Sequence, residues 1–163
     1  MEHRERVYIL CTLGFDPDFT FPNPIPLETT LADVLEKNPS PQFDLTPKAK
    51  AGFIQRGMRD EKPYPIRVHN PSKAHTAFTI TTRSGKRNYD NFIFENDITD
   101  DTFIKVSKKG LEKAGVDLQI IEDTNTNIRK LTPDEVMKLT GLNDEVREKL
   151  KDFKPRDDLL GRY

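Results

Sequence analysis

Proline residues divide this chain into short segments. Twelve of the 163 residues are proline, and four of them lie between Pro17 and Pro26. Because proline fixes φ and lacks a backbone N–H, it disrupts the interior of a helix or of a central strand. Residues 14–28 are therefore expected to form an extended linker, and a second proline-rich segment, 38–45, also favours irregular structure. Helices and strands must fit between these segments.

The composition predicts a modest hydrophobic core. Apolar residues make up 34% of the chain and charged residues 33%, which is polar for a globular protein. The length suits one domain, or a small domain with an extension. No apolar run approaches the roughly 20 residues of a membrane span, and the N-terminal segment lacks a signal-peptide pattern. We therefore expect a soluble, cytoplasmic protein with no membrane partner. The single cysteine, Cys11, cannot form an intrachain disulfide, and its apolar neighbours indicate an inert core thiol.

Local patterns predict short helices and strands, and hence an α+β fold. Thr30, Thr46, Thr132 and Asn143 are candidate helix caps, and Gly141 is a candidate helix stop. The expected helices cover residues 31–35, 48–56, 108–114, 133–139 and 144–153. Alternating or apolar runs predict strands at residues 7–13, 66–68, 76–82, 92–94, 103–106 and 118–121.

Positive charge is concentrated in the middle of the chain. Residues 48–90 carry ten Lys and Arg side chains and three acids, a local charge of +7. The rest of the chain sums to −8, so the net charge of −1 hides this basic block. Such a block is the electrostatic footprint of a nucleic-acid-binding surface. A solvated loop region, or a surface that meets an acidic protein, would carry the same charge.

Three segments follow one another in an order that resembles a known enzyme family. Residues 3–10 read HRERVYIL, the middle region ends in AFTIT at 77–81, and residues 128–142 read IRKLTPDEVMKLTGL. They resemble the Arg-x-Arg strand, the threonine-containing core of the target-recognition domain, and the late Arg-x-Leu-Thr-Pro-x-Glu helix motif of bacterial and phage DNA (cytosine-5) methyltransferases. Residues 24–27 and 31–35 also look like the linker of that family. The likeness spans nearly the whole chain.

The resemblance implies the DNA-recognition portion of a restriction-modification methyltransferase. The family's Pro-Cys nucleophile, Gly-rich methyl-donor loop and Glu-Asn-Val segment do not occur in this sequence. We therefore expect no methyl transfer by this chain alone. It would be a subunit of a split enzyme, with double-stranded DNA and an N-terminal catalytic methyltransferase chain as partners, or a gene fragment. S-adenosyl-L-methionine is expected in the complete enzyme, and no cofactor is expected on this chain alone. A stand-alone DNA-binding module without enzyme activity is the alternative.

The same resemblance implies three parts. Residues 1–45 would be a strand and linker derived from the catalytic domain, 46–127 the target-recognition domain, and 128–163 a C-terminal helical segment. The two flanks would pack on a catalytic sheet that this chain lacks. We therefore expect the middle region, roughly residues 64–121, to be the better ordered part.

Two arginines and a threonine are candidate site residues by this resemblance. Arg6 would approach the O2 edge of a flipped cytosine, and Arg4 would order the same site or a phosphate, both in supporting catalytic roles. A strand entry that ends in solvent is the structural alternative for both. Thr79 would touch the DNA backbone beside the flipped nucleotide, or would be an ordinary β-branched strand residue.

Basic residues of the middle region are the other DNA-binding candidates. Arg83, Lys86 and Arg87 surround a Ser84-Gly85 turn, where a small backbone lets side chains approach DNA closely. A solvated hairpin tip is the alternative. Phosphate contacts, or plain surface positions, are expected for Arg56, Arg59, Lys62, Arg67 and Lys73.

No metal site is expected. His3, His69 and His75 lack the spacing of metal ligands, and each is interpreted as a surface or turn residue. Glu135 is interpreted as a helix-capping acid rather than a catalytic one.

Overall fold

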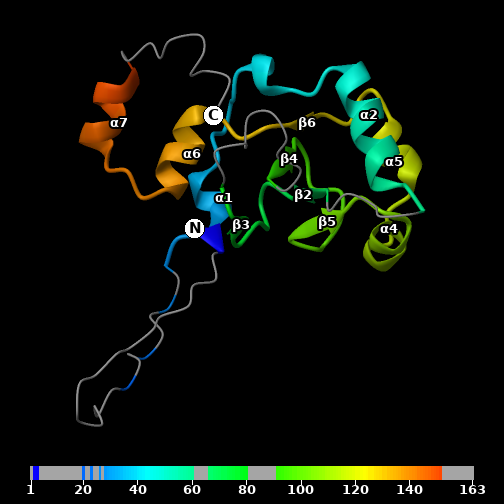
Figure 1. Cartoon of the computed structure of the whole chain (residues 1–163), viewed down its shortest axis with the longest axis horizontal. Helices are drawn as coiled ribbons and strands as arrows, with labels where there is room; N and C mark the ends of the chain where they lie inside the picture. The colour runs from blue at the N-terminus through cyan, green and yellow to red at the C-terminus, as the bar shows by residue number, and fades with distance from the viewer. Residues whose placement is uncertain are drawn as a thin grey trace, which may run out of the picture.

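The computed structural model describes residues 2–3, 20, 23, 26, 28–60, 66–80 and 91–151. Within these residues, a four-stranded sheet lies between two groups of helices (Figure 1). The fold is α+β, as the sequence predicts. None of the described helices is long and apolar enough to cross a membrane.

The sheet is mixed, with the strand order β5-β2-β4-β6. Its two central strands, β2 (Arg67–His69) and β4 (Phe92–Phe94), are parallel. The outer strands, β5 (Phe103–Lys105) and β6 (Ile128–Arg129), run antiparallel to their neighbours. Segments far apart in the sequence therefore meet in one sheet.

Side chains alternate between the two faces of this sheet. Val68 is the register partner of both Phe92 and Ile104, and these three side chains define the first face. His69 is the register partner of Ile93, and these two define the second face. Both faces are covered, which explains why β4 reads as a continuous apolar run.

Three helices cover the first face. They are α2 (Pro47–Gly57), α4 (Lys108–Ala114) and α5 (Leu118–Glu122) (Figure 1). Phe53 of α2 meets Phe92 edge to face, with ring centroids 4.9 Å apart. A Cβ at Gly57 would lie 2.3 Å from the carbonyl oxygen of Val106, so glycine lets α2 rest directly on the backbone that follows β5.

Two helices and a short strand cover the second face. They are α1 (Leu31–Val34), α6 (Pro133–Leu139) and β3 (Ala77–Phe78). Ile93 is fully buried among apolar side chains from all three. β3 also pairs in parallel with β1 (Glu2–His3) in a separate two-stranded sheet.

The predicted helix starts are confirmed. Thr30 and Asp33 form a capping box at α1, and the Thr46 hydroxyl accepts a hydrogen bond from the Ala49 N–H at 3.3 Å. The Asn143 side chain accepts one from the Val146 N–H at 2.9 Å. That bond starts α7 (Asp144–Lys151). The second proline-rich segment contains one short 3-10 turn, η1 (Pro41–Phe43).

The prediction of a strand over residues 118–121 is wrong, because this segment forms helix α5. The Asp117 carboxylate accepts a hydrogen bond from the Gln119 N–H at 2.9 Å and thereby caps the helix. Leu118 and Ile121 pack on the first-face core, whereas Ile120 is exposed. A four-residue apolar run fits either a strand or a helix, so its period could not decide between them.

The other strand predictions have mixed outcomes. The strands expected at 66–68, 92–94 and 103–106 are confirmed to within one residue as β2, β4 and β5. The strand expected at 76–82 is shorter, since only Ala77 and Phe78 pair, and residues 81–82 lie outside the described residues. The strand expected at 7–13 also lies outside them, and β6 was not predicted.

The expectation that the late helices pack on an absent sheet is wrong for α6. Strand β6, which precedes α6, pairs with β4. Leu131 and Leu139 join the cluster that contains Ile93, so α6 covers this chain's own sheet. The division into three parts stays a prediction, although strands from the second and third parts share one sheet.

Candidate functional site

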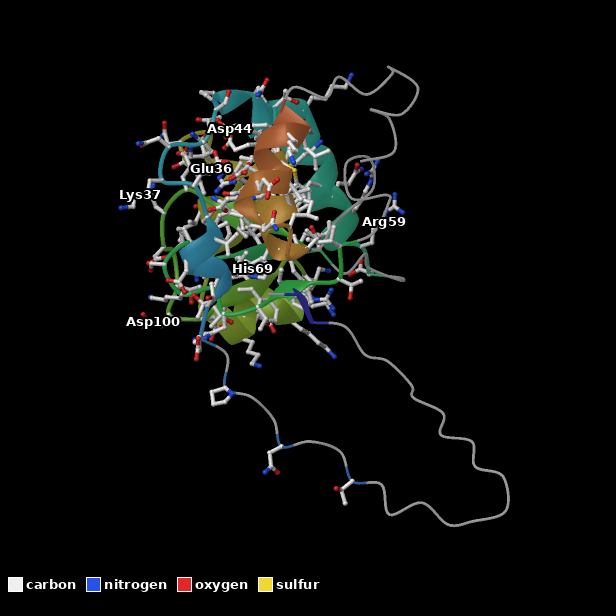
Figure 2. The ribbon with its side chains drawn as sticks, turned by 90° about the vertical axis from the view of Figure 1, so that its left-hand side faces the viewer. Glu36, Lys37, Asp44, Arg59, His69 and Asp100 are labelled. Atoms are coloured by element: carbon white, nitrogen blue, oxygen red, sulfur yellow. The ribbon has the colours of Figure 1, made fainter. Side chains whose placement is uncertain are left out.

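The structure separates the described DNA-binding candidates into two groups. Arg56 and Arg59 are exposed at the C-terminal end of α2, which covers the first face. Lys73 and Thr79 precede and follow β3, which covers the second face, and Arg67 lies in β2. Figure 2 shows Arg59 and Asp100, the ion-pair partner of Lys73, on opposite sides of the molecule. Six further candidates lie outside the described residues: Arg4, Arg6, Lys62, Arg83, Lys86 and Arg87.

Lys73 connects a turn to a neighbouring loop. Its ammonium donates hydrogen bonds to the Thr99 carbonyl at 3.0 Å and to the Asp100 carboxylate at 2.8 Å. The bond to Asp100 raises the pKa of Lys73, and the same bond lowers the pKa of Asp100. Much of the charge of Lys73 is therefore already balanced within the chain.

The Asn70 side chain holds the same loop, residues 97–101, through hydrogen bonds. Its side chain is fully buried and its amide nitrogen donates to the carbonyl oxygens of Thr99, at 3.1 Å, and of Asp101. Its amide oxygen accepts from the Ile98 N–H at 3.3 Å. A buried amide with all these partners gives the loop 97–101 a defined shape.

The interpretation of His69 as a surface or turn residue is wrong. His69 lies in β2 with 1% of its surface exposed, and its Nε2 is 3.2 Å from the Asn91 side-chain oxygen. Asn91 in turn accepts from the Phe78 N–H and donates to the Phe78 carbonyl, both at 2.8 Å. The pair therefore fixes β3 against the sheet. Among the described residues, no three His, Cys, Asp or Glu side chains are grouped to hold a metal.

An aromatic and basic surface lies beside this buried pair. The Arg67 guanidinium carbon is 4.4 Å from the centroid of the Phe78 ring. Phe103 meets Phe78 edge to face, with centroids 5.1 Å apart, and has 37% of its surface exposed. Lys105, the register partner of Arg67, is exposed on edge strand β5. We call Arg67, Phe78, Phe103 and Lys105 the aromatic platform.

The aromatic platform adjoins both ends of the predicted basic turn. Thr79 and Ile80 follow Phe78 directly, and the chain re-enters the described structure at Asn91, which is hydrogen-bonded to Phe78. Residues 81–90, which include Arg83, Lys86 and Arg87, connect these two points. His3 is the register partner of Phe78, and the next residue along each segment is a predicted site residue, Arg4 and Thr79.

Glu135 has a larger role than helix capping. The capping box with Thr132 is confirmed, but Glu135 is also fully buried and forms a bidentate ion pair with Arg129, both N···O distances being 2.8 Å. Its two oxygens accept from the Thr132 N–H at 2.7 Å and the Glu36 N–H at 2.8 Å as well. The Arg and Glu of the late motif thus join β6, α6 and the segment after α1.

Sequence reasoning missed His69, Asn70, Asn91 and the exposed Phe103 as parts of this region. Adjacent His-Asn after an alternating run, and an Asn directly before an apolar strand, were the available signals. Neither signal separates a buried polar residue from a turn residue, because asparagine, present in both signals, is common in turns. Phe103 belonged to an expected strand, and only the sheet order reveals that this strand lies at an edge.

A bacterial methyltransferase is similar to nearly the whole chain. The type II methyltransferase M.NlaX of Neisseria lactamica is 27% identical to it over 154 residues, which are 93% of this chain. The chain spans 40% of the length of that protein. No family profile matches the chain, and no solved structure matches it. The chain is therefore related to part of a type II methyltransferase.

Proposed function

We propose that this chain is the target-recognition portion of a cytosine-5 DNA methyltransferase from a restriction-modification system. The observation that carries the proposal is the similarity to a type II methyltransferase over 93% of the chain. The order of the three sequence segments that resemble cytosine-5 enzymes adds the reaction type and the C-terminal position. The chain would bind double-stranded DNA and act with a catalytic portion that supplies the nucleophile and the S-adenosyl-L-methionine site.

The proposed DNA contacts divide by chemistry. Arg83, Lys86 and Arg87 would supply phosphate and major-groove contacts, because arginine pairs with guanine and both cations neutralise phosphate. Thr79 would contact the backbone beside the target base. Arg4 and Arg6 would place a permanent positive charge near the flipped cytosine. Lys73 would act mainly through the loop that it holds, since Asp100 already binds its ammonium.

Duplex binding by the purified chain tests this proposal. A fluorescently labelled duplex of mixed sequence should bind weakly, and its affinity should fall steeply as salt rises, because phosphate neutralisation releases counterions. Replacement of Arg83, Lys86 and Arg87 together by alanine should weaken binding and flatten the salt dependence. Replacement of Lys48, Lys109 and Lys113, which are exposed on the first-face helices α2 and α4 and are not DNA-binding candidates, is a control with the same change in charge.

Equal loss of duplex affinity in both triple variants would show only a general charge effect and would contradict a specific role for the turn.

A methylation assay separates the proposal from a stand-alone binding module. Labelled S-adenosylmethionine and duplex DNA should give background incorporation with the chain alone. Incorporation should appear when the catalytic portion of the related methyltransferase is added. Binding without any such complementation would favour the stand-alone module.

A further inference from the structure

The aromatic platform combines two kinds of group that nucleic-acid strands need. Phe103 has 37% of its surface exposed on an edge strand, and Arg67 and Lys105 lie beside it on the same face of the sheet. Aromatic rings and guanidinium planes stack on nucleobases, and the cations contact phosphates. Phe103 and Lys105 lie on the same side of β5, and Arg67 is the register partner of Lys105 on the neighbouring strand, so one exposed ring and two cations share this surface.

The aromatic platform is held in place before any ligand binds. Phe78 is fixed by two hydrogen bonds between its backbone and Asn91, and Asn91 contacts the buried His69. Arg67 stacks on Phe78 at 4.4 Å, so its guanidinium is positioned by the ring. A side chain that is already ordered loses less conformational entropy on binding.

Charge alone does not make this surface strongly attractive. Asp101 is exposed two residues before Phe103, and it reduces the net positive charge of the region. A nucleic-acid strand on this surface would therefore need stacking on Phe103 as well as contacts to the two cations. Base faces are accessible to a side chain on a sheet only where the base is unpaired, because paired bases are stacked within the duplex.

We infer that the aromatic platform binds an unpaired DNA nucleotide, with its base stacked on Phe103 and the adjacent phosphates on Arg67 and Lys105. The unpaired base has two sources, a single strand or a bulged position within a duplex. This site goes beyond the proposed recognition of duplex DNA, and it does not require Arg83, Lys86 or Arg87.

A tryptophan placed at the platform provides a direct test. The chain contains no tryptophan, so Phe103→Trp introduces a single indole reporter. Titration with an oligothymidylate should quench its fluorescence through stacking. Ile120→Trp is the matched control, because Ile120 is similarly exposed, at 41%, on a helix of the opposite face. Its fluorescence should not change. Quenching of both reporters, or of neither, would overturn the assignment.

Binding measurements by anisotropy complete the test. Phe103→Ala should weaken oligothymidylate binding by about fivefold or more, and Phe103→Leu, which keeps apolar bulk in case alanine disturbs the fold, should weaken it as well. Lys105→Gln should reduce the slope of log affinity against log salt by about 0.7, the value for one single-strand phosphate contact. Unchanged affinity in Phe103→Leu would refute stacking.

Titrations with different ligands identify the source of the unpaired base and exclude other partners. Oligothymidylate and a duplex with one bulged thymine should each quench the indole of the Phe103→Trp variant more than a fully paired duplex does. Equal quenching by the paired duplex, or by polyglutamate, would refute an unpaired-nucleotide site. Failure of the duplex-binding proposal would appear instead as an unaffected Arg83/Lys86/Arg87 triple variant, so the two ideas fail separately.

Discussion

At the residue scale, buried polar side chains decide how the segments of this protein fit together. Glu135 accepts four hydrogen bonds at 2.7–2.8 Å while fully buried, and two of them come from Arg129. A carboxylate has about four lone-pair sites, so the hydrogen-bonding capacity of Glu135 is fully used. A buried ion pair adds little net stability by itself, but loss of one partner leaves an uncompensated charge.

Glu135→Gln should strongly destabilise the fold. The amide replaces one acceptor oxygen by a donor, which would face two N–H donors, and Arg129 would lose its bidentate ion-pair partner. We expect the free energy of unfolding to fall by about 3–5 kcal/mol in urea denaturation. Asp134→Asn is the control, because its ion pairs with Lys138 and Arg147 are nearer the surface, and it should cost about 1 kcal/mol or less. Similar losses in both variants would contradict the special role of Glu135.

Asp44 should make stability fall as pH rises from acid toward neutral. Burial raises the pKa of Asp44, repulsion from Glu95 adds to it, and Arg129 opposes both. The folded state therefore binds the Asp44 proton more tightly than the unfolded chain does. The contribution of this proton to the free energy of unfolding is full below the ordinary carboxyl pKa of 3.8. It is lost as pH rises through the raised pKa of folded-state Asp44.

Asp44→Asn removes this ionisation and tests the sign. The variant should be more stable than the parent at pH 7, and the difference should disappear in acid, where Asp44 is protonated in the parent. Urea unfolding of both proteins across a pH series measures this. A difference that is constant with pH would assign the effect to packing rather than to charge.

At the element scale, helix α2 contains two glycines, of which one has no room for a side chain and the other does. Gly57 touches the carbonyl of Val106, and a Cβ there would lie 2.3 Å from that oxygen. No atom lies within 4 Å of the Cβ position of Gly52, one and a half turns earlier in the same helix. Helix propensity favours alanine at both positions, but only one has room for it.

Gly52→Ala should stabilise the protein by about 0.5–1 kcal/mol, because alanine restricts the unfolded chain and is a better helix former. Gly57→Ala should destabilise it by about 1–3 kcal/mol, since helix α2 must move away from the sheet. Thermal or urea unfolding of the two variants measures both effects. Equal stabilisation by the two alanines would show that α2 does not rest directly on Val106.

At the scale of the whole molecule, the late segment belongs to the same sheet as the middle region. Ile93 and Phe94 of β4 pair with Arg129 and Ile128 of β6, and α6 covers Ile93. Folding of one segment therefore supports the other. Helix α7 differs, because Val146 and Leu150 are each 38% exposed.

Hydrogen exchange on the monodisperse protein should show this arrangement. Amides of residues 128–139 that are hydrogen-bonded should be protected to the same degree as those of β4, whereas α7 should exchange faster because it buries little apolar surface. Rapid exchange in residues 134–139 with a protected β4 would mean that α6 requires a separate catalytic portion to become ordered. A truncation after residue 141 is the control for α7 and should leave protection of β4 unchanged.

Local chemistry allowed the sequence alone to determine the α+β class, the helix starts and most strands. Thr46 with Pro47, and Thr132 with Glu135, act within one turn, so their effect does not depend on distant residues. The similarity to methyltransferases is also a property of the sequence. Residues 118–121 were misassigned because their short apolar run has no decisive period, and packing on the first face made them helical.

Only the tertiary structure decided which polar residues are buried and which cations share a surface. His69 and Asn91 are 22 residues apart in sequence but meet in the second face, and Arg129 finds Glu135 only because β6 joins β4. Arg59 and Lys73 belong to one basic segment, yet Figure 2 shows Arg59 far from Asp100, the ion-pair partner of Lys73. The reason is physical: strand order and side-chain alternation set these distances, and neither is encoded in local spacing.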